Sequence, residues 1–485
     1  MNAPRGHLSD SDLLRSSAYI DGQWVKASGK PIEVDDPFTL ETFAEVPSLG
    51  AEHAQAAVDA AQAAFPAWAR TTAKERAAIL RRWFDLMIAH KEDLATLMTL
   101  ENGKTLKEAR TEVEYGAGFL EFYAEEATRA YGEIIPAPMP GRRLMADVEP
   151  VGVCAAITPW NFPLAMLTRK AGPALAAGCT MIAKPAEQTP LTALAFAKLG
   201  EEAGLPKGVL NIITGKARIL GEVLTASSVV RKLSFTGSTE VGAALAAACA
   251  PTIKRLSLEL GGNAPLLIFD DAALDVAVET AMTAKFRNGG QSCVAANRIY
   301  VQAAIKDRFV AAFGKRVSAM KAGDGFDESS DIGPLIDERA IEKVDQHRED
   351  ALSHGATCIA GGKSPGGRLA QPTLLADVPA DALLAREETF GPLAGVITFK
   401  TVEDAIRLAN ATPFGLASYL CASDPALIAK VSRDIEAGMV GINTGLISTP
   451  VAPFGGVKMS GLGREGSRHG LMEYQNLKYL CHAGL

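Results

Sequence analysis

Apolar residues follow two different spacings along this chain of 485 residues. Between about residues 51 and 130 they recur every three or four positions, which is the spacing of a buried helix face, so the sequence predicts a helical block. The clearest face comprises Ile79, Leu80, Trp83, Phe84, Met87 and Ile88. From residue 151 onward, short apolar runs alternate with longer segments of helical periodicity.

The short apolar runs predict strands at residues 151–157, 179–183, 209–213, 232–235, 256–260 and 266–269. Helices are expected between them. Short strands that alternate with helices are typical of a parallel sheet with helices on both faces. A second series of this kind runs past residue 440. The fold class is therefore predicted as α/β, with two domains that meet near Gly261-Gly262.

The segment of residues 131–148 interrupts the helical pattern. It contains Pro136, Pro138, Pro140 and Gly141, which favour extended or turn backbone over helix. We therefore expect an extended arm in this part of the chain.

Composition and charge narrow the class of protein. The 49 Lys and Arg against 56 Asp and Glu give a net charge of −7 without a long basic run, so neither nucleic acid nor a membrane is an expected partner. No stretch of 18 apolar residues occurs, and the first 17 residues lack the apolar region of a secretory signal. Seven cysteines without a CxxC pair favour free thiols in a reducing compartment. A cytoplasmic protein is expected.

Two familiar motifs occur in contexts that do not support them. Residues 461–466 spell GxGxxG, but no predicted strand precedes them and too few residues follow for a βαβ unit. Residues 361–364 resemble the end of a phosphate-binding loop, but Thr357 stands where its first glycine is required. The seven histidines show no metal-ligand spacing, so no metal is expected.

A better candidate for phosphate binding is the segment 235–242, where a predicted strand ends and a helix begins. The free N–H groups and positive dipole end of a helix suit a pyrophosphate. A glycine-serine turn with an ordinary helix cap explains the same residues equally well.

Three further residues carry side chains suited to catalysis. Cys293 follows a flexible glycine pair at an expected helix start, where the helix dipole would lower the thiol pKa; a small buried hydrophobe is the alternative. Glu259 ends a strand at the domain break and could activate water, although strict alternation also fits a solvent-facing residue. Asn161 lies between two prolines and could donate to an oxyanion or simply form a turn.

Seven segments in a fixed order resemble the motifs of NAD(P)-dependent aldehyde dehydrogenases. They are 158–163, 184–190, 235–242, 259–262, 290–293, 388–392 and 453–456. The resemblance extends from about residue 20 to the C-terminus. It implies a Rossmann-like NAD-binding domain (1–130 and 149–260), an α/β catalytic domain (261–465) and a small β oligomerisation arm (131–148 and 466–485). Homo-oligomers, tetramers or dimers, are usual in this family.

The resemblance also implies a mechanism and a cofactor site. Cys293 attacks the aldehyde carbon, the Asn161 side chain and the Cys293 N–H hold the oxyanion, and hydride transfer to the nicotinamide leaves a thioester. Glu259 then activates the water that hydrolyses the thioester. Cofactor contacts are implied for Ile157, Trp160, Lys184, Glu187, Gly237, Ser238, Leu260, Glu388 and Phe390.

The expected cofactor is NAD. The Glu187 carboxylate can accept the hydroxyls of the adenosine ribose and would repel a 2′-phosphate. The positive charge of Lys184 would instead favour a 2′-phosphate, so NADP stays a possible cofactor.

Within the family, the segments around Arg169, Arg287 and Ser448 resemble those of succinate-semialdehyde dehydrogenases, in which these residues hold the substrate carboxylate. Arginine forks suit carboxylates geometrically. Without the resemblance, each arginine would be interpreted as a surface ion-pair partner. The expected substrate is a small anionic aldehyde, succinate semialdehyde first; glutarate semialdehyde and 3-sulfolactaldehyde would satisfy the same arginines.

Two rival classes use the same fold. A CoA-acylating relative would pass the thioester to CoA, but such relatives typically lack the water-activating glutamate that Glu259 resembles. A non-catalytic relative is disfavoured by the complete set of Asn161, Glu259 and Cys293. Some relatives carry a second cysteine as a redox switch two residues after the nucleophile, and Ala295 stands there, so no such switch is expected.

Overall fold

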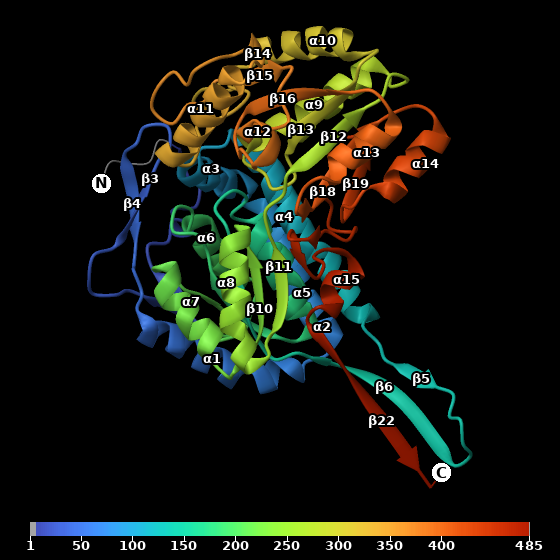
Figure 1. Ribbon diagram of the computed structural model, residues 1–485. Coiled ribbons are helices and arrows are strands. Elements are labelled where there is room, and N and C mark those ends of the chain that lie inside the picture. The colour runs from blue at the N-terminus through green and yellow to red at the C-terminus, as the bar shows by residue number, and fades with distance from the viewer. Residues whose placement is uncertain (1–5, 485) are drawn as a thin grey trace.

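The computed structural model describes residues 6–484, which form two large sheets flanked by helices and one projecting arm (Figure 1). The outermost limits of the predicted domains, at residues 1–5 and 485, lie outside the described residues. No helix within residues 6–484 is long and apolar enough to cross a bilayer.

The first sheet has the strand order β2-β1-β9-β8-β7-β10-β11-β21. Its strands are β1 (Ala18–Ile20), β2 (Gln23–Val25), β7 (Val153–Ile157), β8 (Thr180–Lys184), β9 (Leu210–Ile212), β10 (Val230–Thr236), β11 (Arg255–Glu259) and β21 (Gly461–Leu462). The five central strands β9, β8, β7, β10 and β11 are parallel, and the others join antiparallel at the edges.

Helices cover both faces of the first sheet. They are α1 (Ala51–Ala69), α2 (Ala73–Ala89), α3 (Lys91–Asn102), α4 (Leu106–Glu126), α5 (Ala165–Ala177), α6 (Leu191–Glu202), α7 (Ala217–Ala226) and α8 (Thr239–Cys249). Alternate residues of β7 point to opposite faces, so Val153 and Ala155 pack with α1 and α7, while Cys154 and Ala156 pack with α2, α5 and α6.

The second sheet has the strand order β14-β15-β16-β13-β12-β18-β19 and is parallel except for β14. Its strands are β12 (Ala264–Ile268), β13 (Ala296–Gln302), β14 (Thr357–Ala360), β15 (Thr373–Ala376), β16 (Leu393–Phe399), β18 (Ala417–Cys421) and β19 (Met439–Ile442). Its helices are α9 (Leu274–Phe286), α10 (Lys306–Ala319), α11 (Glu338–Ser353), α12 (Leu383–Arg386), α13 (Val402–Asn410) and α14 (Pro425–Asp434). Two parallel sheets, each buried between helices, confirm the predicted α/β class.

The arm is a three-stranded antiparallel sheet that projects from the body (Figure 1). It consists of β5 (Glu133–Ile135), β6 (Arg142–Pro150) and β22 (Gln475–Ala483), so the proline-rich segment and the C-terminal segment lie side by side. Helix α15 (Ser467–Met472), which precedes β22, is anchored in the body by the buried Leu471. Two short pairs, β3 (Ile32–Asp35) with β4 (Thr42–Val46) and β17 (Phe414–Gly415) with β20 (Val457–Lys458), complete the strands. The division into three domains stays a prediction.

The carboxyl edge of the first sheet meets the amino edge of the second. Residues 260–263 lead from the end of β11 directly to the start of β12. In the first sheet the strand order reverses between β7 and β10. Open parallel sheets bind ligands at the carboxyl ends of the strands where the order reverses, so this junction is where a site is expected.

The start of α5, beside this junction, is capped from another helix. Leu164 at its N-cap position makes no side-chain cap, and Glu112 of α4 accepts hydrogen bonds from the N–H groups of Leu164 (3.0 Å) and Ala165 (3.2 Å). Glu112 also pairs with Lys104 at 2.5 Å, and both side chains are almost completely buried. Lys104 donates in turn to the carbonyl of Asn161 at 2.8 Å. Helix α4 therefore fixes both α5 and the turn that precedes it.

Replacement of Glu112 tests this anchor. Glu112→Ala should lower the free energy of unfolding by about 3–5 kcal/mol, because it leaves the buried Lys104 ammonium without its ion-pair partner. Urea unfolding measures the change. Glu92→Ala is the matched control: Glu92 pairs with Arg110 at the surface, and its loss should cost less than about 1 kcal/mol. Equal effects of the two changes would contradict the anchor.

Candidate active site

A cleft lies at the junction of the two sheets. Its lining comes from the ends of β10 and β11, from the segments that follow β7, β10 and β11, from those that precede β13 and β16, and from α5 and α11. It brings together most of the residues predicted for catalysis and cofactor binding, namely Trp160, Asn161, Gly237, Ser238, Glu259, Leu260, Cys293, Glu388 and Phe390. Segments up to 230 residues apart in the sequence thus share one cavity.

One half of the cleft suits a dinucleotide. Ser238 caps α8, its side chain accepting from Val241 N–H at 3.3 Å, so a strand ends and a helix begins where the sequence predicts. The Thr236 hydroxyl lines the cleft and is buried without a hydrogen-bond partner, which leaves it free for a ligand. An N-terminal helix end and an unpartnered hydroxyl at the carboxyl edge fit a pyrophosphate and its ribose.

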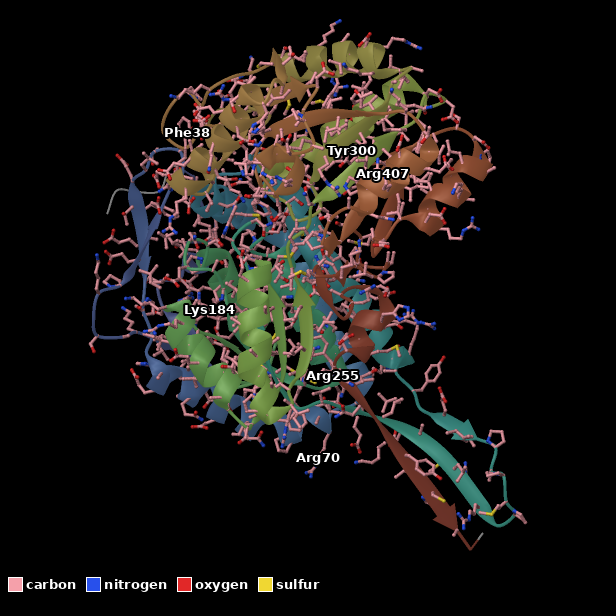
Figure 2. All side chains as sticks on the ribbon, viewed as in Figure 1. Phe38, Arg70, Lys184, Arg255, Tyr300 and Arg407 are labelled. Carbon is pink, nitrogen blue, oxygen red and sulfur yellow. The ribbon has the colours of Figure 1, made fainter. Side chains whose placement is uncertain are left out.

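Three of the predicted cofactor residues stand beside the cleft without lining it. Ile157 and Lys184 are the last residues of β7 and β8 and are paired in register. Lys184, labelled among the helices and strands of the first sheet in Figure 2, is buried. This burial lowers its pKa, whereas the adjacent Glu187 acts to raise it. Glu187 lies 3.6 Å from the Lys184 ammonium and accepts from Ala217 N–H, the first residue of α7, at 3.0 Å.

Cys293 lies in a turn that leads into β13, not into a helix. The expected helix dipole is therefore absent, and the prediction that it lowers the thiol pKa is wrong. Burial raises the pKa of Cys293 to about 12; the carboxyl groups of Glu388 and Glu259 also act to raise it, and Arg169 acts to lower it. The thiol is therefore protonated in the ligand-free protein at neutral pH.

A hydrogen-bond network ties this turn to Asn161. The Asn161 side-chain N–H donates to the Gln291 carbonyl at 3.1 Å. Asn288 donates to the carbonyls of both Asn161 (3.0 Å) and Gln291 (3.2 Å), and the Tyr419 hydroxyl donates to the Val294 carbonyl at 2.7 Å. The side chain of Asn161 and the backbone of the cysteine turn are thereby held in one arrangement.

Two carboxyl groups face the thiol from opposite sheets. Glu259 is buried, so its interpretation as a solvent-facing strand residue is wrong, and both of its carboxyl oxygens lack a hydrogen-bond partner. Burial raises its pKa well above the usual range, and the negative charge of Glu465 adds to the effect. Burial raises the pKa of Glu388 to about 7. Phe390 adopts a left-handed backbone (φ 58°), with its ring edge-to-face with Trp160 at 5.6 Å.

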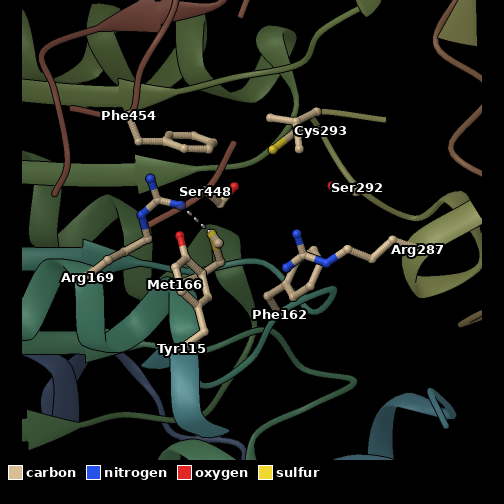
Figure 3. A pocket seen from close by; sticks show the side chains of 10 residues that line it. Tyr115, Phe162, Met166, Arg169, Arg287, Ser292, Cys293, Ser448 and Phe454 are labelled. Atoms are coloured by element: carbon tan, nitrogen blue, oxygen red, sulfur yellow. Dashed lines mark hydrogen bonds between the residues drawn. The ribbon is translucent and has the colours of Figure 1, made fainter. Parts of the chain in front are cut away.

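A second hollow continues from the cleft on the other side of the thiol. It shares Cys293 and Met166 with the cleft and contains Arg169, Arg287 and Ser448 (Figure 3). Arg287 and Ser448 also line a wider hollow beyond it. The two hollows share Tyr115, Phe162, Arg287 and Ser448 and together form a passage that meets the cleft at Cys293.

The two arginines of the passage are held differently. Arg169 is fully buried on α5, pairs with Glu465 at 2.5 Å and lies 3.9 Å from the centre of the Phe454 ring, so its interpretation as a surface ion-pair partner is wrong. One of its terminal nitrogens, Nη2, has no hydrogen-bond partner. Arg287 stacks on Phe162 at 5.2 Å and makes no ion pair within 4.0 Å to any residue among 6–484.

Several residues of the site carry no signal in the sequence pattern. Glu465 pairs with both Arg169 and Lys170, yet it belongs to the GxGxxG segment, which forms the edge strand β21 and the turn after it. Lys343 of α11 lines the cleft near Glu388. The segment 453–456, one of the seven that resemble the family, lies close in sequence to Glu465 and is the signal that could have indicated this residue.

Comparison with known proteins agrees with this geometry. The model of the aldehyde dehydrogenase family matches residues 24–480. The chain is 55% identical to the succinate-semialdehyde dehydrogenase [NADP(+)] GabD of Escherichia coli (strain K12), over 98% of this chain and 99% of that protein. It is 54% identical to the glutarate-semialdehyde dehydrogenase of Pseudomonas aeruginosa (99% and 100%) and 52% identical to the 3-sulfolactaldehyde dehydrogenase of Pseudomonas putida (99% and 99%).

Solved structures agree with the sequences. The crystal structure of succinate-semialdehyde dehydrogenase from Burkholderia pseudomallei superimposes with a TM-score of 0.98 at 52% identity, over 99% of this chain and 100% of that one. The family model, the sequence identities, the superposition and the thiol between the cleft and the passage all indicate the same family. The chain belongs to the aldehyde dehydrogenase family.

Proposed function

We propose that this protein oxidises a small aldehyde with an anionic end, succinate semialdehyde first, to the corresponding acid. Two arginines beside the thiol support this proposal. Arg287 makes no ion pair with a residue among 6–484, the Nη2 atom of Arg169 makes no hydrogen bond there, and both flank the route to Cys293. Unpaired cationic donors in a buried passage favour an anionic ligand. The named relatives act on aldehydes that all carry a carboxylate or sulfonate, so glutarate semialdehyde and 3-sulfolactaldehyde stay alternatives.

The first step we propose is ionisation of the Cys293 thiol, whose proton passes to solvent water, and attack of the resulting thiolate on the aldehyde carbon. The oxyanion that develops is held by the Asn161 side-chain N–H and the Cys293 backbone N–H, which the network around Gln291 keeps in place. The positive charge of Arg169 favours both the thiolate and the oxyanion. A bound nicotinamide cofactor supplies the hydride acceptor.

Residues around the cleft would hold that cofactor. Gly237 and Ser238 lie where a pyrophosphate would meet the N-terminus of α8, and Glu388 and Phe390 lie on the side of the thiol, where the nicotinamide ribose belongs. Trp160, Ile157, Leu260, Lys184 and Glu187 complete the proposed contacts.

We assign Glu259 to the second half of the reaction. Its two carboxyl oxygens have no hydrogen-bond partner, so the side chain can accept the proton of a water molecule beside the thioester. Burial raises the pKa of Glu259, which makes its carboxylate a stronger acceptor for the proton of water. The products are the free acid and the regenerated thiol.

We propose further that the protein is a cytoplasmic homo-oligomer, a tetramer or a dimer. Seven cysteines without a CxxC pair support a reducing compartment. The arm exposes Tyr131, Ile134, Leu477 and Tyr479, and its side chains stand away from the body in Figure 2. An apolar surface of this kind favours contact with another copy of the chain.

A comparison of charged and neutral aldehydes tests the proposed function. The wild type should oxidise succinate semialdehyde with a higher kcat/KM than butanal, measured from the absorbance of NADH. Arg287→Ala should lower kcat/KM for succinate semialdehyde at least tenfold and leave butanal nearly unchanged, since a charge-assisted contact contributes about 1.5–3 kcal/mol. Arg287→Lys keeps the charge but loses the fork and should still cost activity. Equal rates for the two aldehydes in the wild type would refute the proposal.

Replacement of Glu259 separates the two halves of the reaction. In Glu259→Gln, a rapid burst of NADH should survive while steady turnover falls by roughly 10²–10⁴, because the amide cannot accept the proton of water. Rapid-mixing absorbance measures both phases. Unimpaired steady turnover would show that another group activates the water.

The protonation of the thiol predicts a pH dependence. Because the pKa of Cys293 is raised to about 12 by burial, its thiolate fraction should still increase about tenfold per pH unit between about pH 8 and 10, where an ordinary cysteine levels off. The measurement is the rate at which iodoacetamide abolishes activity in the cofactor-free enzyme. Activity rather than total alkylation is followed, because Cys358 and Cys481 are exposed. A plateau below about pH 9 would contradict burial as the dominant effect.

The cofactor preference depends on Glu187. The carboxylate is 39% exposed at the end of β8, where it would repel a 2′-phosphate, so the wild type should prefer NAD. Glu187→Ser should shift kcat/KM toward NADP, because Lys184 then faces the phosphate without a competing carboxylate. The prediction fails if the wild type already prefers NADP.

A further inference from the structure

The hydroxyl of Tyr115 is buried beside the hydroxyl of Ser448 and forms no hydrogen bond of normal geometry with any residue among 6–484. Tyr115 lies on α4, and its ring packs edge-on against Phe119, with the ring centres 5.0 Å apart. Its hydroxyl points into the passage, toward the space between Arg169 and Ser448 (Figure 3). Burial of a hydroxyl without a partner costs free energy, so its retention at this place indicates a partner that the protein itself does not supply.

The surroundings of this hydroxyl are cationic and polar. Burial raises the pKa of Tyr115, and the guanidinium groups of Arg169 and Arg287 and the hydroxyl of Ser448 act to lower it, so all three lie close to the phenol oxygen. Tyr115 lines both the hollow beside the thiol and the wider hollow beyond it. A ligand whose end lies between the two arginines therefore meets the Tyr115 hydroxyl.

Helix packing fixes the position of the hydroxyl relative to Arg169. At the next residue, Gly116, an added Cβ would approach Leu164 Cγ at 3.2 Å, so α4 and α5 are in close contact there. Arg169 is on α5, one and a half turns beyond Leu164, and is held by Glu465. The phenol and the guanidinium are thus presented to the passage by two rigid, directly packed helices.

We propose that the Tyr115 hydroxyl donates a hydrogen bond to the anionic end of the substrate and so contributes to the selection of anionic over neutral aldehydes. This inference rests on the proposed function. Arg169 is already partly neutralised by Glu465, so a neutral O–H donor adds a directed contact to the anion without adding another buried charge. An uncharged aldehyde offers the hydroxyl no comparable acceptor.

The isosteric change Tyr115→Phe tests the proposal. It should lower kcat/KM for succinate semialdehyde at least tenfold, about 1.4 kcal/mol, mainly through KM, and leave butanal within twofold. The thermal midpoint should not fall, because only a hydroxyl without a protein partner is lost. Tyr300→Phe is the matched control: the Tyr300 hydroxyl accepts from Arg298 at 3.2 Å in the second sheet (Figure 2), so its removal should leave the ratio of the two aldehydes unchanged.

The outcomes separate this inference from the proposed function. A wild type that does not prefer succinate semialdehyde over butanal would refute the proposed function and this inference with it. A wild type with that preference, and a Tyr115→Phe variant within twofold of it, would overturn the role of Tyr115 alone. Equal losses for both aldehydes would also overturn it, because the hydroxyl would then support the shape of the passage rather than recognise charge.

Discussion

A single buried carboxylate, Glu465, sets the charge balance on which the site depends. It pairs with Arg169 and Lys170, adjacent residues of α5 that are both fully buried. Within this cluster the two cations exceed the one anion, and the Glu259 carboxyl, whose pKa is raised, lies beside it. Such buried pairs add little net stability, but loss of one partner is costly, so the cluster acts chiefly to fix geometry and charge. The segment that carries Glu465 also joins β21 to the edge of the first sheet.

Burial gives the site both its selectivity and its main energetic obstacle. The groups that must lose a proton, Cys293 and Glu259, have raised pKa values because they are desolvated. The same low-polarity surroundings strengthen the attraction between the excess positive charge and an anionic substrate or an oxyanion. An anionic substrate that reaches the thiol therefore places its negative charge beside Arg169 and Arg287, which can compensate it.

The sequence predicts the layers of this fold well because strand length and helix periodicity are local properties. It also locates residues such as Asn161, Glu259 and Ser238, since each lies at or shortly after the end of a strand and parallel strands end at one edge. Prediction from the sequence fails where one local pattern is compatible with two different structures. A glycine pair before Cys293 precedes a strand as readily as a helix, and alternation at Glu259 cannot tell a solvated face from one covered by helices. Contacts such as Lys170 with Glu465, 295 residues apart, leave no trace in a local pattern.

The mass of the peptide that carries Cys293 shows directly whether this thiol receives the aldehyde. In the Glu259→Gln variant, mixed with succinate semialdehyde and NAD and quenched with acid, we expect a thioester that adds one succinyl group to this peptide and to no other cysteine peptide. The same variant without NAD should show no stable adduct, because the thiohemiacetal reverts to thiol and aldehyde. A succinyl group on another residue, or an unmodified Cys293 peptide after NADH has formed, would show that this buried thiol does not receive the aldehyde.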